Sequence, residues 1–365
     1  MSETFHRLPI VSVRRLNDTA VEVTFAVPEV NAAALKFKPG QHVAVRATIG
    51  GIEQQRTYSM CSGRGGPFRI GIKHVAGGTF STWANTHLKT GESLDVGAPQ
   101  GRFTLPAGTG APRDILMLAA GAGITPILGM SIDALENEPE TRITLVYGNR
   151  TLAHAMFLTE LEDLKDRYPA RFDLLNVLSG RGEAEAELLQ GRITGEKLKA
   201  LTTQRIDLRS FERAFVCGPG SFIKETRNAL FELGLTREVV HHEFFIGRTA
   251  NTTPQPAQRP EIAPEEPVVM ATGTIDAIAV LDGQRHRFPL APGQHVLDAA
   301  LKAGIKAPHS CTGGMCSTCR ARLVEGTATM TVNYSLEDWE MKRGFILTCQ
   351  AVATSHTLVV DYDAM

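Results

Sequence analysis

Four cysteines near the C-terminus have a spacing that suits an iron–sulfur centre. Cys311, Cys316 and Cys319 share one short loop with the pattern C-x4-C-x2-C, and Cys349 follows at a distance. Three thiolates on a tight loop and a fourth from a distant segment can wrap two bridged irons, and this spacing ligates [2Fe–2S] clusters. Zinc ribbons instead pair two C-x2-C motifs, and this sequence has only one. The pattern predicts a centre that moves single electrons; a zinc site and unrelated cysteines are the alternatives.

The loop that carries the first three cysteines is rich in small residues, which suits the same interpretation. Small side chains let backbone N–H groups turn toward the cysteine sulfurs, and such hydrogen bonds tune the reduction potential. The residues concerned are Gly313, Gly314, Ser317 and Thr318.

The composition is that of a multidomain globular protein. At 365 residues, with 43% hydrophobic and 21% charged residues, the chain suits two or three domains. A formal net charge of −1 gives no electrostatic reason to expect nucleic acid or membrane as a partner. Cys61 and Cys217 have no plausible disulfide framework, and residues 1–7 lack a signal-peptide pattern. We therefore expect a cytoplasmic protein.

One uncharged stretch, residues 115–132, just reaches the length of a transmembrane helix. Its interior, residues 121–126, has the sequence Gly-Ala-Gly-Ile-Thr-Pro. Glycines and a proline in this order predict instead a buried strand, a tight turn and the start of a helix.

The rhythm of apolar residues divides the chain into four segments. Short runs separated by glycine turns predict an antiparallel β-barrel over 1–108. Apolar strands that alternate with helical patterns predict an α/β domain with a parallel sheet over 109–246. Residues 247–270 are rich in Pro, Thr, Gln and Glu and are expected to be a linker, so 271–365 forms the cysteine-bearing domain.

The string Pro-Gly-Gln-His-Val occurs at 39–43 and again at 292–296. The first copy is followed by a strand-like segment and the second by a helical one. We interpret the repetition as coincidence and expect no repeat architecture.

Three strands of the α/β domain end in glycine-containing turns that suit a nucleotide. Ligands of open α/β sheets lie beyond the carboxyl ends of the strands. Gly121 and Gly123 would let the backbone approach a pyrophosphate, and Thr125 could cap the following helix. Pro126 replaces the third glycine of the full dinucleotide fingerprint, so tight turns selected for packing are the alternative. The three turns are 121–126, 147–150 and 217–220.

Ser179 and Arg181 follow the expected strand at 172–178. A hydroxyl and a guanidinium in this place could bind the 2′-phosphate of NADPH. The pair favours NADPH over NADH; an ordinary solvated loop is the alternative.

In the expected barrel, residues 56–59 have the sequence Arg-Thr-Tyr-Ser at the end of a strand. Alternation along a strand places Arg56 and Tyr58 on one face. A cation suited to a pyrophosphate would therefore lie beside a flat ring suited to an aromatic cofactor. An ordinary strand is the alternative.

The order of these motifs resembles the ferredoxin–NADP reductase superfamily over residues 5–246, and the C-terminal part resembles plant-type ferredoxins. This fusion order is that of class IA-like reductases of bacterial oxygenases. The resemblance implies an antiparallel FAD-binding β-barrel (1–108), an NAD(P)-binding α/β domain with a parallel sheet (109–246) and an α+β, β-grasp [2Fe–2S] ferredoxin domain (271–365). The motifs lie at 56–59, 77–81, 121–126, 147–150 and 217–219.

A closer resemblance, over essentially the whole chain, is to the family of reductase subunits of phenylacetyl-CoA epoxidase complexes. It implies a multisubunit diiron epoxidase as partner; a steroid hydroxylase, a desaturase and another ring oxygenase are the alternatives. The segments that carry this resemblance are 4–6, 146–151, 333–337 and 359–364.

The resemblance implies residue roles in the FAD site. Tyr58 would stack on the isoalloxazine, Ser59 would hydrogen-bond near flavin N5, and Arg56 would neutralise the FAD pyrophosphate. Further FAD contacts through backbone and hydroxyl groups would come from Lys73, His74, Gly78 and Ser81.

The resemblance also implies roles around the nicotinamide. Cys217 would lie at the nicotinamide–flavin contact, with a small buried hydrophobic residue as the alternative interpretation. Glu243 and Phe245 would close against the flavin, so that Ser59, Cys217 and Glu243 surround the reacting atoms. The remaining NAD(P) contacts are Gly121, Gly123, Thr125, Arg150, Ser179, Arg181, Gly218 and Pro219.

The expected activity is electron transfer from NADPH or NADH through FAD and a [2Fe–2S] cluster to an oxygenase. A redox sensor without a turnover partner and a zinc-stapled nucleotide-binding adaptor are the competing interpretations. The sequence gives little indication of the surface on which the partner docks. A local acidic patch is one candidate surface, formed by Glu337, Asp338, Glu340, Asp361 and Asp363.

Overall fold

The computed structural model describes residues 4–182, 184, 186–244, 273–309, 312–314, 317–333, 335–336 and 338–364. The chain divides into two compact units, of which the first is Phe5–Phe245 and the second holds the C-terminal part. The expected linker, 247–270, lies outside the described residues. The expected domain boundary at 108/109, within the first unit, falls between the last barrel strand and the first strand of the parallel sheet. This boundary stays a prediction.

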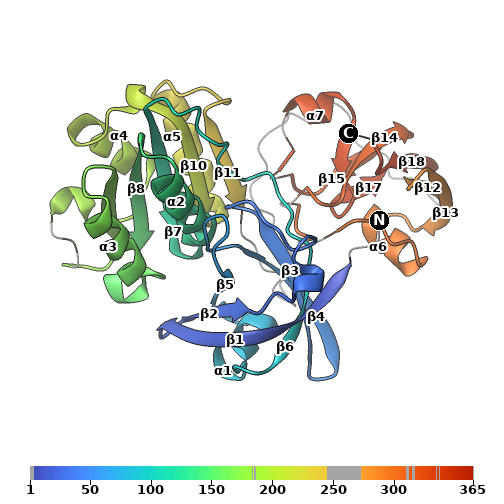
Figure 1. The fold of residues 1–365 in the computed structure, drawn as a ribbon. Helices are drawn as coiled ribbons and strands as arrows, with labels where there is room; N and C mark the ends of the chain where they lie inside the picture. The colour runs from blue at the N-terminus through green and yellow to red at the C-terminus, as the bar shows by residue number, and fades with distance from the viewer. Residues whose placement is uncertain are drawn as a thin grey trace. The chain divides into compact units, whose positions relative to one another are not determined.

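The first part of the Phe5–Phe245 unit is an antiparallel barrel, as expected (Figure 1). The strands have the spatial order β4-β3-β6-β1-β2-β5, and a bridge from Met60 to Ile70 joins the end of β4 to β5. Helix α1 (Thr79–Thr86) packs on β5. The strands are β1 (Phe5–Asn17), β2 (Ala20–Phe25), β3 (His42–Ile49), β4 (Ile52–Ser59), β5 (Phe68–Lys73) and β6 (Ser93–Gly97).

The second part of this unit is an α/β domain around a parallel sheet with the order β11-β10-β7-β8-β9. Every expected strand is present. The stretch at 115–132 forms a strand, the short 3-10 turn η2 (Gly121–Gly123) and a helix, as the sequence predicts. The strands are β7 (Arg113–Ala120), β8 (Thr141–Asn149), β9 (Phe172–Leu178), β10 (Phe211–Gly218) and β11 (Val240–Phe244). The helices are α2 (Ile124–Asn137), α3 (Leu158–Arg167), α4 (Gly195–Gln204) and α5 (Gly220–Glu232).

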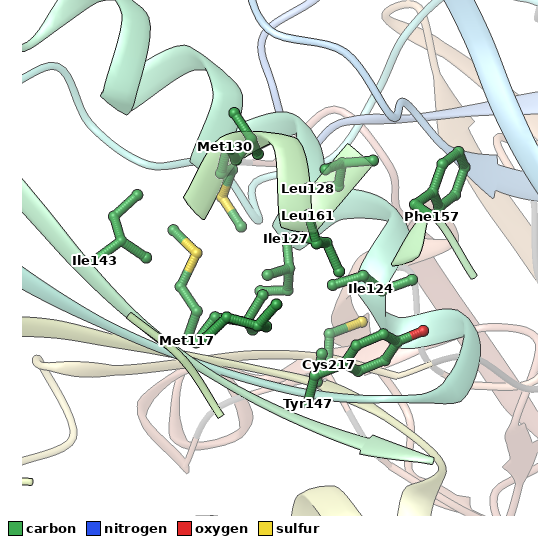
Figure 2. Packing of buried hydrophobic residues seen from close by; sticks show 14 of the residues in the cluster. Met117, Ile124, Ile127, Leu128, Met130, Ile143, Tyr147, Phe157, Leu161 and Cys217 are labelled. Carbon is green, nitrogen blue, oxygen red and sulfur yellow. The ribbon is translucent and has the colours of Figure 1, made fainter. Parts of the chain in front are cut away.

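Alternation along the central strand β7 separates the two faces of this sheet. Ile115 and Met117 pack in one hydrophobic cluster with residues of α2 and α3, part of which Figure 2 shows. Leu116 and Leu118 pack in a second cluster with residues of α4 and α5. The sheet is therefore covered on both faces, which is why its strands are almost continuously apolar.

The C-terminal unit has the β-grasp arrangement that the sequence led us to expect. Its main sheet has the order β13-β12-β18-β14-β16, in which β12 and β18 are parallel, and α6 packs against β13. The elements are β12 (Ile275–Leu281), β13 (Gln284–Leu290), α6 (Val296–Lys302), β14 (Arg320–Glu325), β15 (Ala328–Met330), α7 (Asp338–Lys342), β16 (Phe345–Leu347), β17 (Ala351–Ala353) and β18 (Thr357–Asp361).

The two copies of Pro-Gly-Gln-His-Val adopt different structures, which confirms that they are no repeat. The first copy leads into β3, where His42 is the first strand residue. The second leads into α6, where His295 is the N-cap residue and lies 3.7 Å from Asp298.

Among the described residues, none of the helices combines the length and the apolarity needed to cross a membrane.

A buried arginine holds the barrel against the α/β domain. Arg69 on β5 donates from Nη1 to Glu22 Oε2 on β2 (2.8 Å) and from the same nitrogen to Glu160 Oε2 on α3 (3.0 Å). It also donates to Ser62 Oγ (2.9 Å) and to the carbonyl oxygen of Cys61 (2.9 Å). A buried charge with this many partners defines one relative placement of the two parts.

Replacing Arg69 by alanine should therefore destabilise the protein strongly. The change removes the buried cation that lies between Glu22 and Glu160 and leaves Glu22 only its ion pair with the half-exposed Arg14, and breaking one side of a buried ion pair costs about 3–5 kcal/mol. Urea unfolding of the full chain measures the loss. The matched control is Arg7→Ala, because Arg7 is exposed and lies 3.5 Å from Asp95, a surface pair worth about 0–1 kcal/mol. Equal effects of the two substitutions would contradict the role given to Arg69.

Candidate functional site

The end of barrel strand β4 meets the ends of β10 and β11 of the parallel sheet. Ser59 is the last residue of β4, and its hydroxyl donates to Glu243 Oε2 on β11 over 3.5 Å. Glu243 lies opposite Cys217 in the register of β10 and β11. The structure thus brings together Ser59, Cys217 and Glu243, the three residues expected at the reacting centre, from two different sheets.

His42 is a further member of this group that our reading of the sequence missed. It pairs with Ser59 in the β3–β4 register, is 4% exposed, and its Nδ1 lies 3.4 Å from Glu243 Oε1. The two oxygens of one carboxylate therefore face a hydroxyl and an imidazole. The signal available in the sequence was the repeated pentapeptide, because its first copy, residues 39–43, contains His42.

Cys217 is suited to contact rather than to nucleophilic chemistry. Its side chain is fully buried, and it belongs to the same cluster as Tyr147 (Figure 2). Burial raises the pKa of the Cys217 thiol well above its usual value, and the charge of Glu243 raises it further. The thiol stays neutral and presents a small, polarisable group at the end of β10.

Tyr58 lies in an aromatic row on the barrel. Its ring is 5.7 Å from that of Phe80, which in turn lies 5.7 Å from Trp83 in an edge-on contact. Burial raises the pKa of Tyr58, and the nearby Arg56 opposes that shift, so the phenol stays protonated. Arg56 is held by the carbonyl of Gln55 (2.7 Å) and by Gln54 Oε1 (3.1 Å). A flat ring beside an anchored cation suits the flavin and pyrophosphate of FAD, as the sequence suggested.

The other expected FAD contacts lie at the end of β5 and in the turn before α1. The amide of His74 donates to Thr19 O (2.7 Å), and the amide of Gly78 donates to Val75 O (2.9 Å). The hydroxyl of Ser81 accepts from Val75 N (3.1 Å) and lies 3.3 Å from Gly78 O. These groups therefore form hydrogen bonds within the turn itself. Their contacts to FAD stay a prediction, and carbonyl oxygens of the turn and the first amides of α1 would have to make them.

Lys73 lies at the border between the two parts of the unit. Its Nζ is 3.3 Å from the position of a Cβ on Gly121, which has a φ of +54°. Burial lowers the pKa of Lys73. An anionic phosphate in this place would oppose that shift and favour the charged ammonium group, which suits a bound dinucleotide.

The glycine turn after β7 is shaped mainly by packing. A Cβ on Gly123 would lie 2.0 Å from the carbonyl oxygen of Cys217, so only glycine lets η2 approach β10. Tyr147, which the sequence analysis included only as the first residue of the 147–150 turn, donates its hydroxyl to Gly121 O (3.1 Å) and accepts from Met156 N (3.1 Å).

The expectation that Thr125 caps α2 is wrong. The N-cap residue is Gly123, no side chain caps the helix, and the Thr125 hydroxyl donates to Ala122 O (3.0 Å). The helix begins directly after the 3-10 turn, so Thr125 already lies inside it. Its contact to a nucleotide phosphate stays a prediction.

The loops after β8 and β9 lie side by side. Gly180 N donates to Arg150 O (2.7 Å), and Ser179 N donates to Asn149 O (2.9 Å). Arg150, Ser179 and Arg181 are all exposed, so the structure brings three polar side chains to one edge of the sheet. At the neighbouring turn Pro219 is the N-cap residue of α5, and Gly218 packs closely on Ala120.

In the C-terminal unit, Cys311 and Cys316 lie outside the described residues, as does Phe245 in the first unit. Cys319 and Cys349 are 2% and 3% exposed. Thr312 and Ser317 have left-handed φ values of +49° and +55°, so the backbone of this loop turns tightly at both residues. Among the described residues, no group of three or more metal-ligating side chains is found. Two of the four cysteines lie outside those residues. Two buried thiols beside a tightly turned loop fit a [2Fe–2S] cluster.

The prediction that Glu340 belongs to an exposed acidic patch is wrong. Glu340 is 1% exposed and forms an ion pair with Arg320, whose guanidinium lies over Phe345. The carboxylate of Asp363 accepts from the amides of Asp282 (2.9 Å) and Gly283 (2.8 Å). These groups therefore stabilise the fold. Glu337 and the side chain of Asp338 lie outside the described residues.

Comparisons with known proteins agree with the order of these sites. The family described as Oxidoreductase FAD-binding domain matches residues 7–105, and Oxidoreductase NAD-binding domain matches 117–228. The family described as 2Fe-2S iron-sulfur cluster binding domain matches residues 279–354. FAD, nicotinamide-nucleotide and [2Fe–2S] domains thus follow one another as expected.

Two curated relatives match almost the whole chain. A subunit of the 1,2-phenylacetyl-CoA epoxidase of Escherichia coli (strain K12) is 38% identical over 362 residues, which are 99% of this chain and 98% of that protein. The 3-ketosteroid-9-alpha-monooxygenase, ferredoxin reductase component, of Mycobacterium tuberculosis (strain ATCC 25618 / H37Rv) is 33% identical over 367 residues, with coverages of 98% and 95%.

Solved structures show the same fold. Phthalate dioxygenase reductase matches with a TM-score of 0.58 at 21% identity and covers 98% of both chains. An intact type IV self-sufficient cytochrome P450 monooxygenase matches with a TM-score of 0.67 at 19% identity, over 98% of this chain and 41% of that one.

Cys61 and Cys217 should resist alkylation in the native protein. Burial raises the pKa of both thiols, so at pH 8 neither forms the reactive thiolate. Mass spectrometry after treatment with iodoacetamide should find both unmodified in buffer and both modified in urea. Modification of Cys217 in buffer at the rate seen in urea would contradict the burial described above.

Proposed function

Because the chain belongs to the family of NAD(P)H-dependent flavin and iron–sulfur reductase components of oxygenases, we propose that its partner is a multisubunit diiron epoxidase that acts on phenylacetyl-CoA. The similarity to the phenylacetyl-CoA epoxidase protein, at 38% identity, supports this choice over the steroid monooxygenase reductase, at 33%. When bound, FAD would accept a hydride from the nicotinamide and release its two electrons one at a time to the [2Fe–2S] centre.

The choice of partner rests on this similarity, and the observation that supports hydride transfer from the nicotinamide to FAD is the contact between Ser59 and Glu243. It places the end of the barrel, with Tyr58 and Arg56, against the strand ends that would hold the nicotinamide. Near-attack placement of two reactants removes much of the entropic barrier of a hydride transfer. The side chains here bind and orient, and the neutral thiol of Cys217 keeps the contact apolar.

The residues would act on FAD as follows. Tyr58 offers its ring to the isoalloxazine, and Arg56 and Lys73 offer cations to phosphate groups. Ser59 would direct its hydroxyl oxygen toward flavin N5 while it donates its proton to Glu243, which His42 also contacts.

Thiolate ligands of the cluster would come from Cys311, Cys316, Cys319 and Cys349. We place the protein in the cytoplasm, where thiols such as Cys61 and Cys217 are kept reduced.

Reconstitution tests the partner. Mixed with a phenylacetyl-CoA epoxidase oxygenase component, the protein should support NAD(P)H-dependent epoxide formation, and it should support a steroid hydroxylase far less well. Reduction of cytochrome c by NAD(P)H, measured without any oxygenase, reports the relay itself. Cytochrome c reduction combined with better coupling to the steroid hydroxylase would overturn the choice of partner and leave the relay intact.

Ser59→Ala belongs to the same test. It should lower cytochrome c reduction and epoxide formation in the same proportion, by about 100-fold, because both depend on the placement of the reactants for hydride transfer. Ser12→Ala, on β1 of the same barrel, is the control and should change neither rate.

We further propose that the donor is NADPH. Arg181 and Ser179 are exposed beside Arg150 at the sheet edge, where a 2′-phosphate would meet two guanidinium groups.

Arg181→Ala should raise the KM for NADPH by about tenfold, the cost of one charge-assisted hydrogen bond, and leave the KM for NADH unchanged. Initial rates with both donors measure this. Arg209→Ala is the control, since Arg209 lies outside these loops and pairs with Asp207. Equal changes with both donors would remove the argument for NADPH.

A further inference from the structure

Gln350 directly follows the last cysteine, and its side chain turns back toward that cysteine. Its Nε2 lies 3.7 Å from Cys349 Sγ and 3.0 Å from the carbonyl oxygen of Thr312. A carboxamide nitrogen carries two hydrogens, so it can donate to both atoms at once. The Thr312 carbonyl only accepts, which directs the NH2 end of the amide toward the sulfur.

The loop of the first cysteines closes over this side chain. A Cβ on Gly314, which has a φ of +80°, would lie 3.0 Å from Gln350 Cγ and 3.2 Å from Val332 Cγ2. Gln350 itself is 8% exposed. The amide is therefore held in a nearly dry position between the loop and Cys349, where a hydrogen bond is electrostatically stronger than in water.

Among the described residues, the hydroxyls of Thr348 and Ser335 donate to backbone oxygens of the cysteine-bearing loop. Thr348 Oγ1 donates to Cys319 O (2.9 Å) and accepts from the hydroxyl of Tyr362 (3.0 Å). Ser335 Oγ donates to Gly314 O (3.4 Å). These contacts position the loop, whereas the contact from Gln350 reaches a sulfur that would belong to the cluster.

We propose that Gln350 raises the reduction potential of the [2Fe–2S] centre by donating a hydrogen bond to the sulfur of Cys349. The inference rests on the proposed ligation by Cys349. Reduction adds one electron, supplied by the reduced flavin, and neither forms nor breaks a bond. The added charge spreads onto the cysteine sulfurs, so a donor there stabilises the reduced state more than the oxidised one.

Gln350→Met tests the proposal, because methionine has a similar volume and no donor. The equilibrium constant for reduction should fall three- to tenfold, which for a one-electron couple is a shift of about 28 to 59 mV to more negative potential. A potentiometric titration followed by EPR of the reduced cluster measures it. Iron and sulfide content reports separately whether the cluster is bound, so failure of the proposed ligation is distinguishable from failure of this inference.

Ser335→Ala is the matched control. It removes a side-chain bond to the same loop without touching a sulfur. The potential should stay at the wild-type value. Equal shifts in the two variants would show that Gln350 only anchors the loop and would overturn the proposal.

A measurement on the wild-type protein decides the matter if Gln350→Met fails to assemble a cluster. Cell-free synthesis with glutamine labelled with 15N in the side chain should give a 15N coupling in pulsed EPR of the reduced cluster. Absence of that coupling in the cluster-loaded wild type would overturn the proposal, as would an unchanged potential in Gln350→Met.

Discussion

The arrangement proposed for hydride transfer depends on one carboxylate, that of Glu243, which lies where two sheets of different kinds meet. One oxygen faces the hydroxyl of Ser59 at the end of a barrel strand, and the other faces the imidazole of His42. The same residue lies beside Cys217 on the parallel sheet. A cofactor held by the barrel and a nucleotide held by the sheet can react only if this seam keeps a constant geometry. Arg69 fixes the seam from a second place, through buried bonds to Glu22 and Glu160.

Much of this architecture could be predicted from local sequence. The cysteine spacing, the glycine turns at strand ends and the change of apolar rhythm each reflect chemistry within a few neighbouring residues. The expected strands, the barrel, the parallel sheet and the β-grasp unit are all confirmed. The roles of single site residues stay predictions, although the structure brings Ser59, Cys217 and Glu243 together.

What the sequence could not show is mostly contact between distant segments. His42 meets Glu243, and Arg69 meets Glu160, across separations that no local pattern encodes. The error at Thr125 came from a helix that starts directly after a 3-10 turn, so the residue expected at its cap lies inside it. The error at Glu340 came from an acidic residue that is buried against Arg320 rather than solvated.

The exposed loops that carry Arg150 and Arg181 stand apart from the buried seam. Substitutions on exposed loops rarely change the free energy of unfolding by more than about 0.5 kcal/mol, whereas changes in the seam disturb buried charges. Under the role proposed for Arg181, a substitution that changes the donor preference would therefore leave the contact between Ser59 and Glu243 and the free energy of unfolding almost unchanged.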